Sequence, residues 1–118
     1  TGTHPVCLVS GGELSSPVLG DGVGGRNQAF VLECVPRIDG DSIGILSAGT
    51  DGVDGSSPAA GAIADGTTMS RALASEMNPG AFAARSDSHT FFHRLGDDIR
   101  CGPTGNNVRD VRVLVAWT

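Results

Sequence analysis

The sequence has no lysine, so every cationic side chain other than histidine is one of eight arginines. These arginines are scattered, and no cluster of even three basic residues occurs. With 13 acidic residues the formal net charge is -5, whereas nucleic-acid surfaces need a clustered basic face, so we expect no nucleic-acid partner. Because a guanidinium keeps its charge when partly buried and presents a planar fork, an arginine near a glycine-rich loop is a candidate for binding phosphate or carboxylate.

Long apolar runs are also lacking. No segment approaches the roughly 20 apolar residues that span a bilayer, so we expect no membrane partner. No secretory leader is recognisable at the start of the sequence. The three cysteines Cys7, Cys34 and Cys101 match no zinc-ligand spacing and lie in or beside apolar runs. This pattern favours buried free thiols in a reducing cytoplasm.

Glycine, in contrast, is abundant, with 18 of 118 residues. The length suits one domain, and abundant glycine without a repeat indicates tight loops in which backbone approaches other groups closely. Apolar runs predict buried strands over residues 5–9, 42–47 and 111–117, the last apolar on both faces. Helices are predicted over residues 26–35, from about residue 67, and from about residue 88. This alternation predicts an α/β fold, a three-layer α/β/α domain with a mixed β-sheet.

The loop from Gly49 to Gly55 follows the second predicted strand and carries two carboxylates, Asp51 and Asp54. Open α/β sheets bind their ligands outside the carboxyl ends of strands. These carboxylates are therefore candidates to bind a metal ion or a substrate hydroxyl. The alternative interpretation is a pair of Asp-Gly turns that only reverse the chain.

A second glycine-rich loop, residues 20–28, leads directly into a predicted helix. Free N–H groups and the positive end of the helix dipole meet at a helix N-terminus and favour phosphate or carboxylate. Arg26 and Asn27 lie there. The loop matches neither the P-loop nor the dinucleotide-binding pattern. The turn from Ser10 to Glu13 could likewise form a nest of N–H groups for an anion, or could simply end its strand.

His89 and His93 lie four residues apart on a predicted helix and therefore share a face. Two histidines at this spacing can bind zinc. The same helix offers no third ligand, and no glutamate stands between the histidines as in the protease motif. We expect solvated surface histidines.

Four motifs resemble, in order and spacing, the MOFRL domain. This is the C-terminal domain of type-2 glycerate kinases, which have also been named hydroxypyruvate reductases. The resemblance covers nearly the whole chain, from about Val6 to Val115. The motifs are Ser-Gly-Gly-Glu at 10–13, Gly-Gly-Arg-Asn-Gln at 24–28, Ser-Ala-Gly-Thr-Asp-Gly-Val-Asp-Gly at 47–55 and Gly-Pro-Thr-Gly-Asn-Asn-Val-Arg-Asp at 102–110.

The resemblance implies that residues 1–118 form a single MOFRL-like domain, the C-terminal half of a two-domain enzyme whose N-terminal Rossmann-like domain is absent from this sequence. It implies transfer of the γ-phosphoryl group of ATP, with Mg²⁺, to D-glycerate, giving 2-phosphoglycerate in the cleft between the two domains. The family's essential lysine belongs to the N-terminal domain, and this chain has none. We therefore expect glycerate and that domain as partners, and no activity from the isolated chain. The oligomeric state stays open, a dimer included.

In such a cleft Arg26 would neutralise the transferring phosphate or bind the substrate carboxylate, and Asp51 and Asp54 would orient a hydroxyl or bind Mg²⁺ through water. The other loop residues are candidates to bind substrate or phosphate: Ser10, Gly11, Gly12, Glu13, Gly24, Gly25, Asn27, Thr104, Gly105, Asn106 and Asn107.

Two other functions remain open from the sequence. One is a stand-alone module that binds a small anion without turnover. The other is a hydroxypyruvate reductase, although the chain carries no dinucleotide fingerprint.

Overall fold

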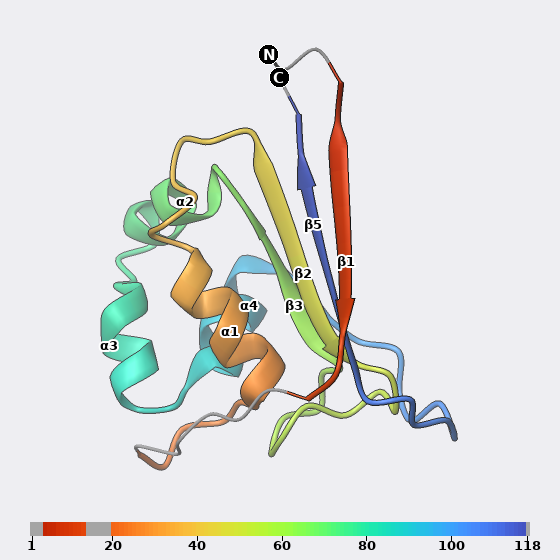
Figure 1. The fold of residues 1–118 in the computed structure, drawn as a ribbon. Coiled ribbons are helices and arrows are strands. Elements are labelled where there is room, and N and C mark those ends of the chain that lie inside the picture. Colours follow the sequence, from red (N-terminus) through yellow and green to blue (C-terminus); the bar gives the residue numbers. More distant parts are fainter. Residues whose placement is uncertain (1–3, 14–19, 118) are drawn as a thin grey trace.

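The computed structural model describes residues 4–13 and 20–117. Within these residues, five strands and four helices follow one another (Figure 1). None of the helices among the described residues has the length and apolarity that a bilayer crossing requires. The elements are β1 (Val6–Gly11), α1 (Arg26–Cys34), β2 (Ile43–Gly49), β3 (Gly61–Asp65), α2 (Thr68–Ala74), α3 (Pro79–Ala84), α4 (Ser88–Leu95), β4 (Asp98–Ile99) and β5 (Asp110–Ala116).

The strands form one sheet in the order β1-β5-β2-β3-β4, and the α/β class predicted from the sequence is confirmed. Every pairing among the described strands is antiparallel, so the sheet is not mixed. The β2–β3 connection shows the reason. It contains no helix, whereas two parallel neighbours need a longer crossover that usually includes one.

All four helices lie on one side of the sheet (Figure 1). The described chain therefore has two layers rather than the predicted three. The core lies between helices and sheet, where Val31 and Leu32 of α1 and Phe91 and Phe92 of α4 are at most 2% exposed. The small residues of β3, Ala62 and Ala64 among them, let α1 pack closely against the sheet.

The opposite face of the sheet is partly open. Ile63 of β3 is 44% exposed, and residues 111–116 of β5 are all half-buried. The prediction that β5 is covered on both sides is therefore wrong. β1 is a strand as expected, but every residue in it is exposed because it lies at the edge of the sheet.

The cysteines also differ from expectation. Cys7 and Cys101 are exposed, and Cys34 is half-buried. Cys7 is exposed because it lies in the edge strand β1, and Cys101 is exposed because it lies in a surface loop. Burial raises the pKa of the Cys34 thiol. The prediction of three buried thiols is therefore wrong, because an apolar run does not reveal whether its strand will be an edge.

One end of the sheet gathers the polar loops. The register places Gly49, the last residue of β2, opposite Asp110, the first residue of β5. Gly11 at the end of β1 lies opposite Val111. The N-terminus of α1 and the loops after β1, after β2 and before β5 therefore lie together, at the lower edge of Figure 1. The antiparallel register brings these loops to one edge of the sheet.

Candidate functional site

The centre of this edge is an ion pair between Arg26, the first residue of α1, and Asp110, the first residue of β5. Arg26 Nε donates to Asp110 Oδ2 at 2.6 Å, and Nη2 donates to Oδ1 at 2.9 Å. The Asp110 side chain is fully buried, whereas that of Arg26 is 38% exposed. Two parallel hydrogen bonds from a planar fork fix the orientation of the guanidinium. Arg26 is thus held at the surface by a carboxylate beneath it.

Further carboxylates surround Arg26. The hydrogen-bonded Asp110 is the main cause that raises the pKa of Arg26 above its ordinary value; burial opposes the shift, and Glu13 and Asp54 add to it. Arg26 and the Asp51/Asp54 loop therefore lie on the same side of the molecule, as the sequence predicts. The guanidinium is the centre of an acidic neighbourhood rather than part of a cationic patch.

Asp54 occupies the N-terminus of α1 and is 1% exposed. Its Oδ1 accepts from the backbone N–H of Asn27 at 3.0 Å and from Asn27 Nδ2 at 3.2 Å. Its Oδ2 accepts from the backbone N–H of Gln28 at 2.8 Å and from Gln28 Nε2 at 3.1 Å. Four donors use the four lone-pair sites of a carboxylate. A carboxylate of the chain itself therefore fills the anion position that the sequence assigned to a ligand.

Two predicted roles need correction as a result. Asp54 has no lone pair to spare for Mg²⁺ or for a substrate hydroxyl. Asn27 is fully buried, donates to Asp54 and accepts from Ser47 Oγ at 2.7 Å, so it belongs to an internal network and not to a cleft wall. The free N–H groups and dipole of a helix attract any carboxylate in reach, and here the loop after β2 supplies one.

The glycines before α1 explain how Asp54 comes so close. A Cβ on Gly25 would lie 2.4 Å from the Asp54 side chain, and a Cβ on Gly24 would lie 2.4 Å from Ser88 Oγ. Gly55 has φ +59°, and a Cβ there would lie 2.3 Å from the Gly24 carbonyl oxygen. Gly24 and Gly25, predicted to bind phosphate, are thus required for the loop to pass between neighbouring segments. Phosphate binding by them stays a prediction.

Asp51 differs from Asp54. Its side chain is half-buried, and Oδ1 accepts from the backbone N–H of Val53 at 3.1 Å in a local turn. The loop carrying it is joined to the loop before β5, since Thr104 Oγ1 donates to the Thr50 carbonyl at 2.6 Å and the Thr104 N–H donates to the Asp51 carbonyl at 3.1 Å. Thr50 Oγ1 in turn donates to the Arg109 carbonyl at 2.7 Å. The structure thus brings Asp51 and Thr104 together in one exposed double loop.

The remaining residues of the 102–109 loop are exposed. Gly105 has φ +76° at its tip. Asn106 Nδ2 contacts the Thr104 carbonyl at 3.5 Å, and Asn107 Oδ1 accepts from the Arg109 N–H at 2.9 Å. Both amides therefore serve turns of their own loop while remaining accessible to a ligand.

The turn after β1 is held by a residue that the sequence interpretation did not single out. Arg112 Nη2 donates to the carbonyl of Gly11 at 2.8 Å and to Ser10 Oγ at 3.3 Å, and both of its terminal nitrogens reach the Gly12 carbonyl at 3.3 Å. Carbonyl groups of this turn thus face a guanidinium. Glu13 follows, exposed and close enough to Arg26 to affect its pKa.

One of the two histidines, His89, differs from expectation. His89 is 7% exposed, so it is not a solvated surface residue, whereas His93 is exposed. His89 Nδ1 lies 3.1 Å from Gln28 Oε1, and Gln28 Nε2 also donates to Ser57 Oγ at 2.7 Å. Burial is the main cause that lowers the pKa of His89. The imidazole extends the Asp54 network toward α4.

Four residues of this site were not among the candidate site residues from the sequence: Ser47, Ser57, Asp110 and Arg112. A signal was available for Asp110, since a carboxylate at the start of a strongly apolar strand needs a partner. Ser47 and Ser57 gave no local signal, because their partners lie 20 and 29 residues away in the sequence.

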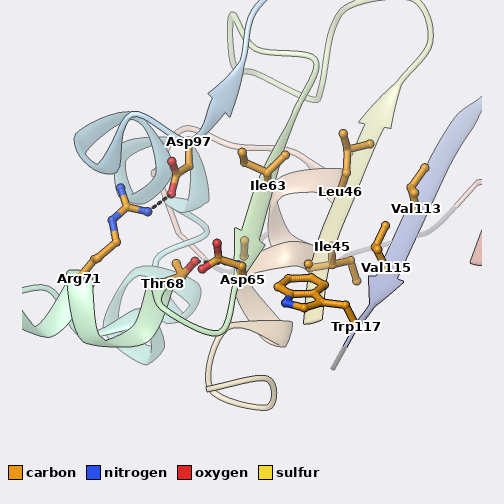
Figure 2. Close-up of a pocket in the computed structure, with 12 residues that line it drawn as sticks. Ile45, Leu46, Ile63, Asp65, Thr68, Arg71, Asp97, Val113, Val115 and Trp117 are labelled. Atoms are coloured by element: carbon orange, nitrogen blue, oxygen red, sulfur yellow. Dashed lines mark hydrogen bonds and ion pairs between the residues drawn. The ribbon is translucent and has the colours of Figure 1, made fainter. Parts of the chain in front are cut away.

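A hollow of about 380 Å³ lies on the open face of the sheet (Figure 2). Leu46, Ile63 and Val113 line it, with Trp117 at one end. It lies toward the end of the strands opposite to Gly49 and Asp110. Arg71 at its edge donates to Asp97 Oδ2 at 2.7 Å and to the Leu95 carbonyl at 2.8 Å. The hollow is mainly apolar, and the guanidinium of Arg71 is already bound to Asp97 and the Leu95 carbonyl, so the hollow does not suit phosphate. The candidate site remains the edge of the sheet with Arg26.

Known proteins match this chain over almost its full length. The description "MOFRL family" belongs to the family model that matches residues 6–110. D-glycerate 2-kinase of Thermotoga maritima is 39% identical over 108 residues, which are 91% of this chain and 26% of that protein. Human glycerate kinase is 40% identical over 121 residues, covering 96% of this chain and 23% of that protein. A relative from Agrobacterium vitis, 40% identical, has a provisional hydroxypyruvate reductase name.

The solved structures agree. The crystal structure of glycerate kinase from Thermotoga maritima matches with a TM-score of 0.90 and 37% identity, over 93% of this chain and 27% of that one. A protein from Pyrococcus horikoshii matches with a TM-score of 0.90 and 31% identity, over 95% of this chain and 26% of that one. This chain therefore spans about a quarter of the length of these relatives. On the strength of the match over residues 6–110, the chain belongs to the MOFRL family.

Proposed function

We propose that this chain is the C-terminal domain of a glycerate kinase and supplies one wall of its active site. The whole enzyme would transfer the γ-phosphoryl group of ATP, with Mg²⁺, to D-glycerate and give 2-phosphoglycerate. The name of the Thermotoga maritima relative, D-glycerate 2-kinase, supports this reaction. The greater length of the relatives supports a second, N-terminal domain across the cleft.

The observation that carries the proposal is the Arg26–Asp110 pair at the loop-bearing edge of the sheet. Phosphoryl transfer depends mainly on positioning and on neutralising charge. A guanidinium fixed by two hydrogen bonds to a buried carboxylate is already oriented before the ligand arrives, so little side-chain entropy is lost on binding. Arg26 would contact the transferring phosphate or the substrate carboxylate, and Asp110 would act as its positioning residue.

The charges near Arg26 explain why this wall needs a partner. Asp110 offsets the charge of Arg26, and Glu13 and Asp54 lie close enough to act on it. A polyphosphate would be repelled by this wall alone. A divalent cation and cationic residues on the facing domain would supply the missing positive charge, as Mg²⁺ bound by one or two carboxylates and phosphate oxygens commonly does.

Within the wall we assign different roles to the two loop aspartates. Asp51, half-buried and in the exposed double loop with Thr104, would contact Mg²⁺ through water or a substrate hydroxyl. Asp54 would instead hold the first turn of α1, and with it Arg26, in place. Asn106 and Asn107 would line the cleft beside Asp51.

A chimera tests the proposal. These 118 residues would replace the matching C-terminal quarter of the Thermotoga maritima D-glycerate 2-kinase, and ATP- and glycerate-dependent phosphoryl transfer would be measured. We expect an active chimera, an inactive isolated chain, and a loss of about 100-fold or more in kcat/KM on Arg26→Ala, typical of removing a charge-stabilising donor. Arg26→Lys should also lose activity, because an ammonium cannot form the paired contact with Asp110.

The control is Arg37→Ala, which removes an exposed arginine just beyond α1 and should leave the activity unchanged. A folded chimera that has no kinase activity, or one in which Arg26→Ala is as active as Arg37→Ala, would contradict the proposed role of this wall.

A further inference from the structure

A second cluster of polar side chains lies away from Arg26, where α4 meets β4. His89 and His93 lie one turn apart on α4, with their rings stacked at a centroid distance of 5.4 Å. Asp98 is the first residue of β4, just after the helix ends. One ligand atom from each of the three residues lies within 4.8 Å of the others. The third ligand that α4 itself lacks is thus supplied by the next strand.

We propose that His89, His93 and Asp98 form a binding site for a divalent transition-metal ion such as Zn²⁺, which the side chain of Arg100 closes when no ion is bound. Imidazole and carboxylate ligands suit zinc. Three protein ligands leave a fourth position of a tetrahedral ion for water.

The hydrogen bonds of His89 prepare it for this role. Its Nδ1 lies 3.1 Å from Gln28 Oε1, which can only accept, so Nδ1 carries the proton and Nε2 keeps its lone pair. A ligating histidine almost always has its second nitrogen bound in this way, since that bond fixes the tautomer and the ring orientation. Gln28 is in turn held by Asp54 and Ser57.

Arg100 occupies the space between the ligands. Its Nε donates to Asp98 Oδ2 at 2.9 Å, and its Nη2 lies 3.5 Å from His89 Nε2. A guanidinium and a metal ion cannot share these atoms. The Arg100 side chain is 50% exposed, so it can move into water at little cost, because exposed ion pairs contribute little to stability.

The geometry needs only a small contraction. Ligands about 2.0–2.1 Å from a tetrahedral zinc lie roughly 3.3 Å apart, somewhat closer than the present limit of 4.8 Å. His93 is 59% exposed and already 3.4 Å from Asp98, so its side chain has room to turn toward the other two ligands.

The test is a calorimetric titration of the chain with Zn²⁺ in a Cys7→Ser, Cys101→Ser background, which removes the two exposed thiols as competing ligands. We expect one ion per chain. His93→Gln and Asp98→Asn should each weaken binding by about tenfold or more, as the loss of one ligand implies, whereas Arg100→Gln should tighten it. Asp97→Asn is the matched control, since this neighbouring carboxylate is paired with Arg71 outside the cluster and its loss should change nothing.

A second measurement avoids variants of His89, whose loss could disturb folding through Gln28. In nitrogen-15 spectra of the imidazoles, Zn²⁺ should shift His89 Nε2 while Nδ1 keeps its proton. Binding that is equally strong in His93→Gln and Asp98→Asn, or that weakens in Arg100→Gln, or that is absent from all variants, would overturn the proposal.

Discussion

Asp51 and Asp54 lie three residues apart in one loop, yet they belong to different kinds of structure. Asp54 is buried, and all four of its acceptor sites are used by two consecutive residues of α1. Asp51 is half-buried and accepts from the backbone of its own turn. The comparison teaches that a carboxylate in a glycine-rich loop supports either the fold or the chemistry according to how many donors reach it.

The same division runs through the whole edge of the sheet. A buried polar network runs from Ser47 through Asn27, Asp54 and Gln28 to His89. Beside it lies the exposed double loop with Asp51 and Thr104. Arg26 lies between the two regions. Its guanidinium is paired with the buried Asp110, and its side chain is partly exposed to solvent. We expect stability to depend on the first region and activity on the second.

The largest effect is expected for Asp54→Ala. It leaves the donors of Asn27 and Gln28 at the start of α1 without their acceptor, and unsatisfied buried groups cost about 1–3 kcal/mol each. We expect a loss of about 3 kcal/mol or more in the free energy of unfolding, measured by urea denaturation.

Asp51→Ala is the control for that measurement. It should change the free energy of unfolding by about 0.5 kcal/mol or less, as surface substitutions commonly do, while lowering the activity of the chimera. Equal destabilisation by the two variants would remove the distinction between the aspartates.

The next effect concerns the Arg26–Asp110 pair. In a double-mutant cycle of Arg26→Ala and Asp110→Asn, we expect a coupling of about 1.5–3 kcal/mol, the range for hydrogen bonds to charged groups. The measurement is urea denaturation of both single variants and the double variant. A coupling near zero would show that the carboxylate does not orient the guanidinium.

A smaller effect is expected for Gly55→Ala compared with Gly40→Ala. Both glycines have positive φ, +59° and +78°, so both substitutions strain the backbone. Only at Gly55 would the new Cβ collide with other backbone, 2.3 Å from the Gly24 carbonyl oxygen, whereas nothing lies within 4 Å at Gly40. Gly55→Ala should therefore lower the free energy of unfolding by about 1–3 kcal/mol more, the usual cost of overpacking. Similar losses at the two positions would mean that the loops do not need this close approach.

The smallest effect is a dependence of stability on pH. Burial lowers the pKa of His89 in the folded chain below its ordinary 6.5. As the pH falls below about 6.5, His89 of the unfolded chain binds a proton more readily than His89 of the folded chain. The free energy of unfolding therefore decreases as the pH falls below about 6.5. Neighbouring charges also act on this ring. Asp98 and Asp87 raise the pKa of His89, whereas Arg100 and His93 lower it further.

The urea midpoint at about pH 5.5 and pH 7.5 measures this dependence across the ordinary range of histidine. His89→Gln should reduce the difference between the two midpoints, whereas His4→Gln, at an exposed position near the start of the chain, should leave it unchanged. A His89→Gln variant with the full wild-type difference would contradict the lowered pKa of His89.

Local rules identified several elements correctly. The helix predicted over residues 26–35 is α1, which ends just before Pro36. Asn78 and Pro79 mark the start of α3, and Gly96, in the left-handed region at φ +76°, ends α4. β3 was not predicted, because its alanines and glycine give a weak strand pattern and it forms only through pairing with β2. The sequence analysis singled out the Arg26 region because a glycine loop before a helix is a local signal.

The sequence by itself determined the α/β class, the family, the helix boundaries set by proline and glycine, and the set of polar loops, since these depend on neighbouring residues and on ordered motifs. Only the tertiary structure decided which carboxylate reaches α1, that Asp110 pairs with Arg26, that β1 is an exposed edge and that Asp98 joins two histidines. The first three outcomes depend on groups far apart in the chain, whose distance is fixed by packing and strand register. The fourth depends on how the chain turns between α4 and β4. A local sequence pattern does not contain this information.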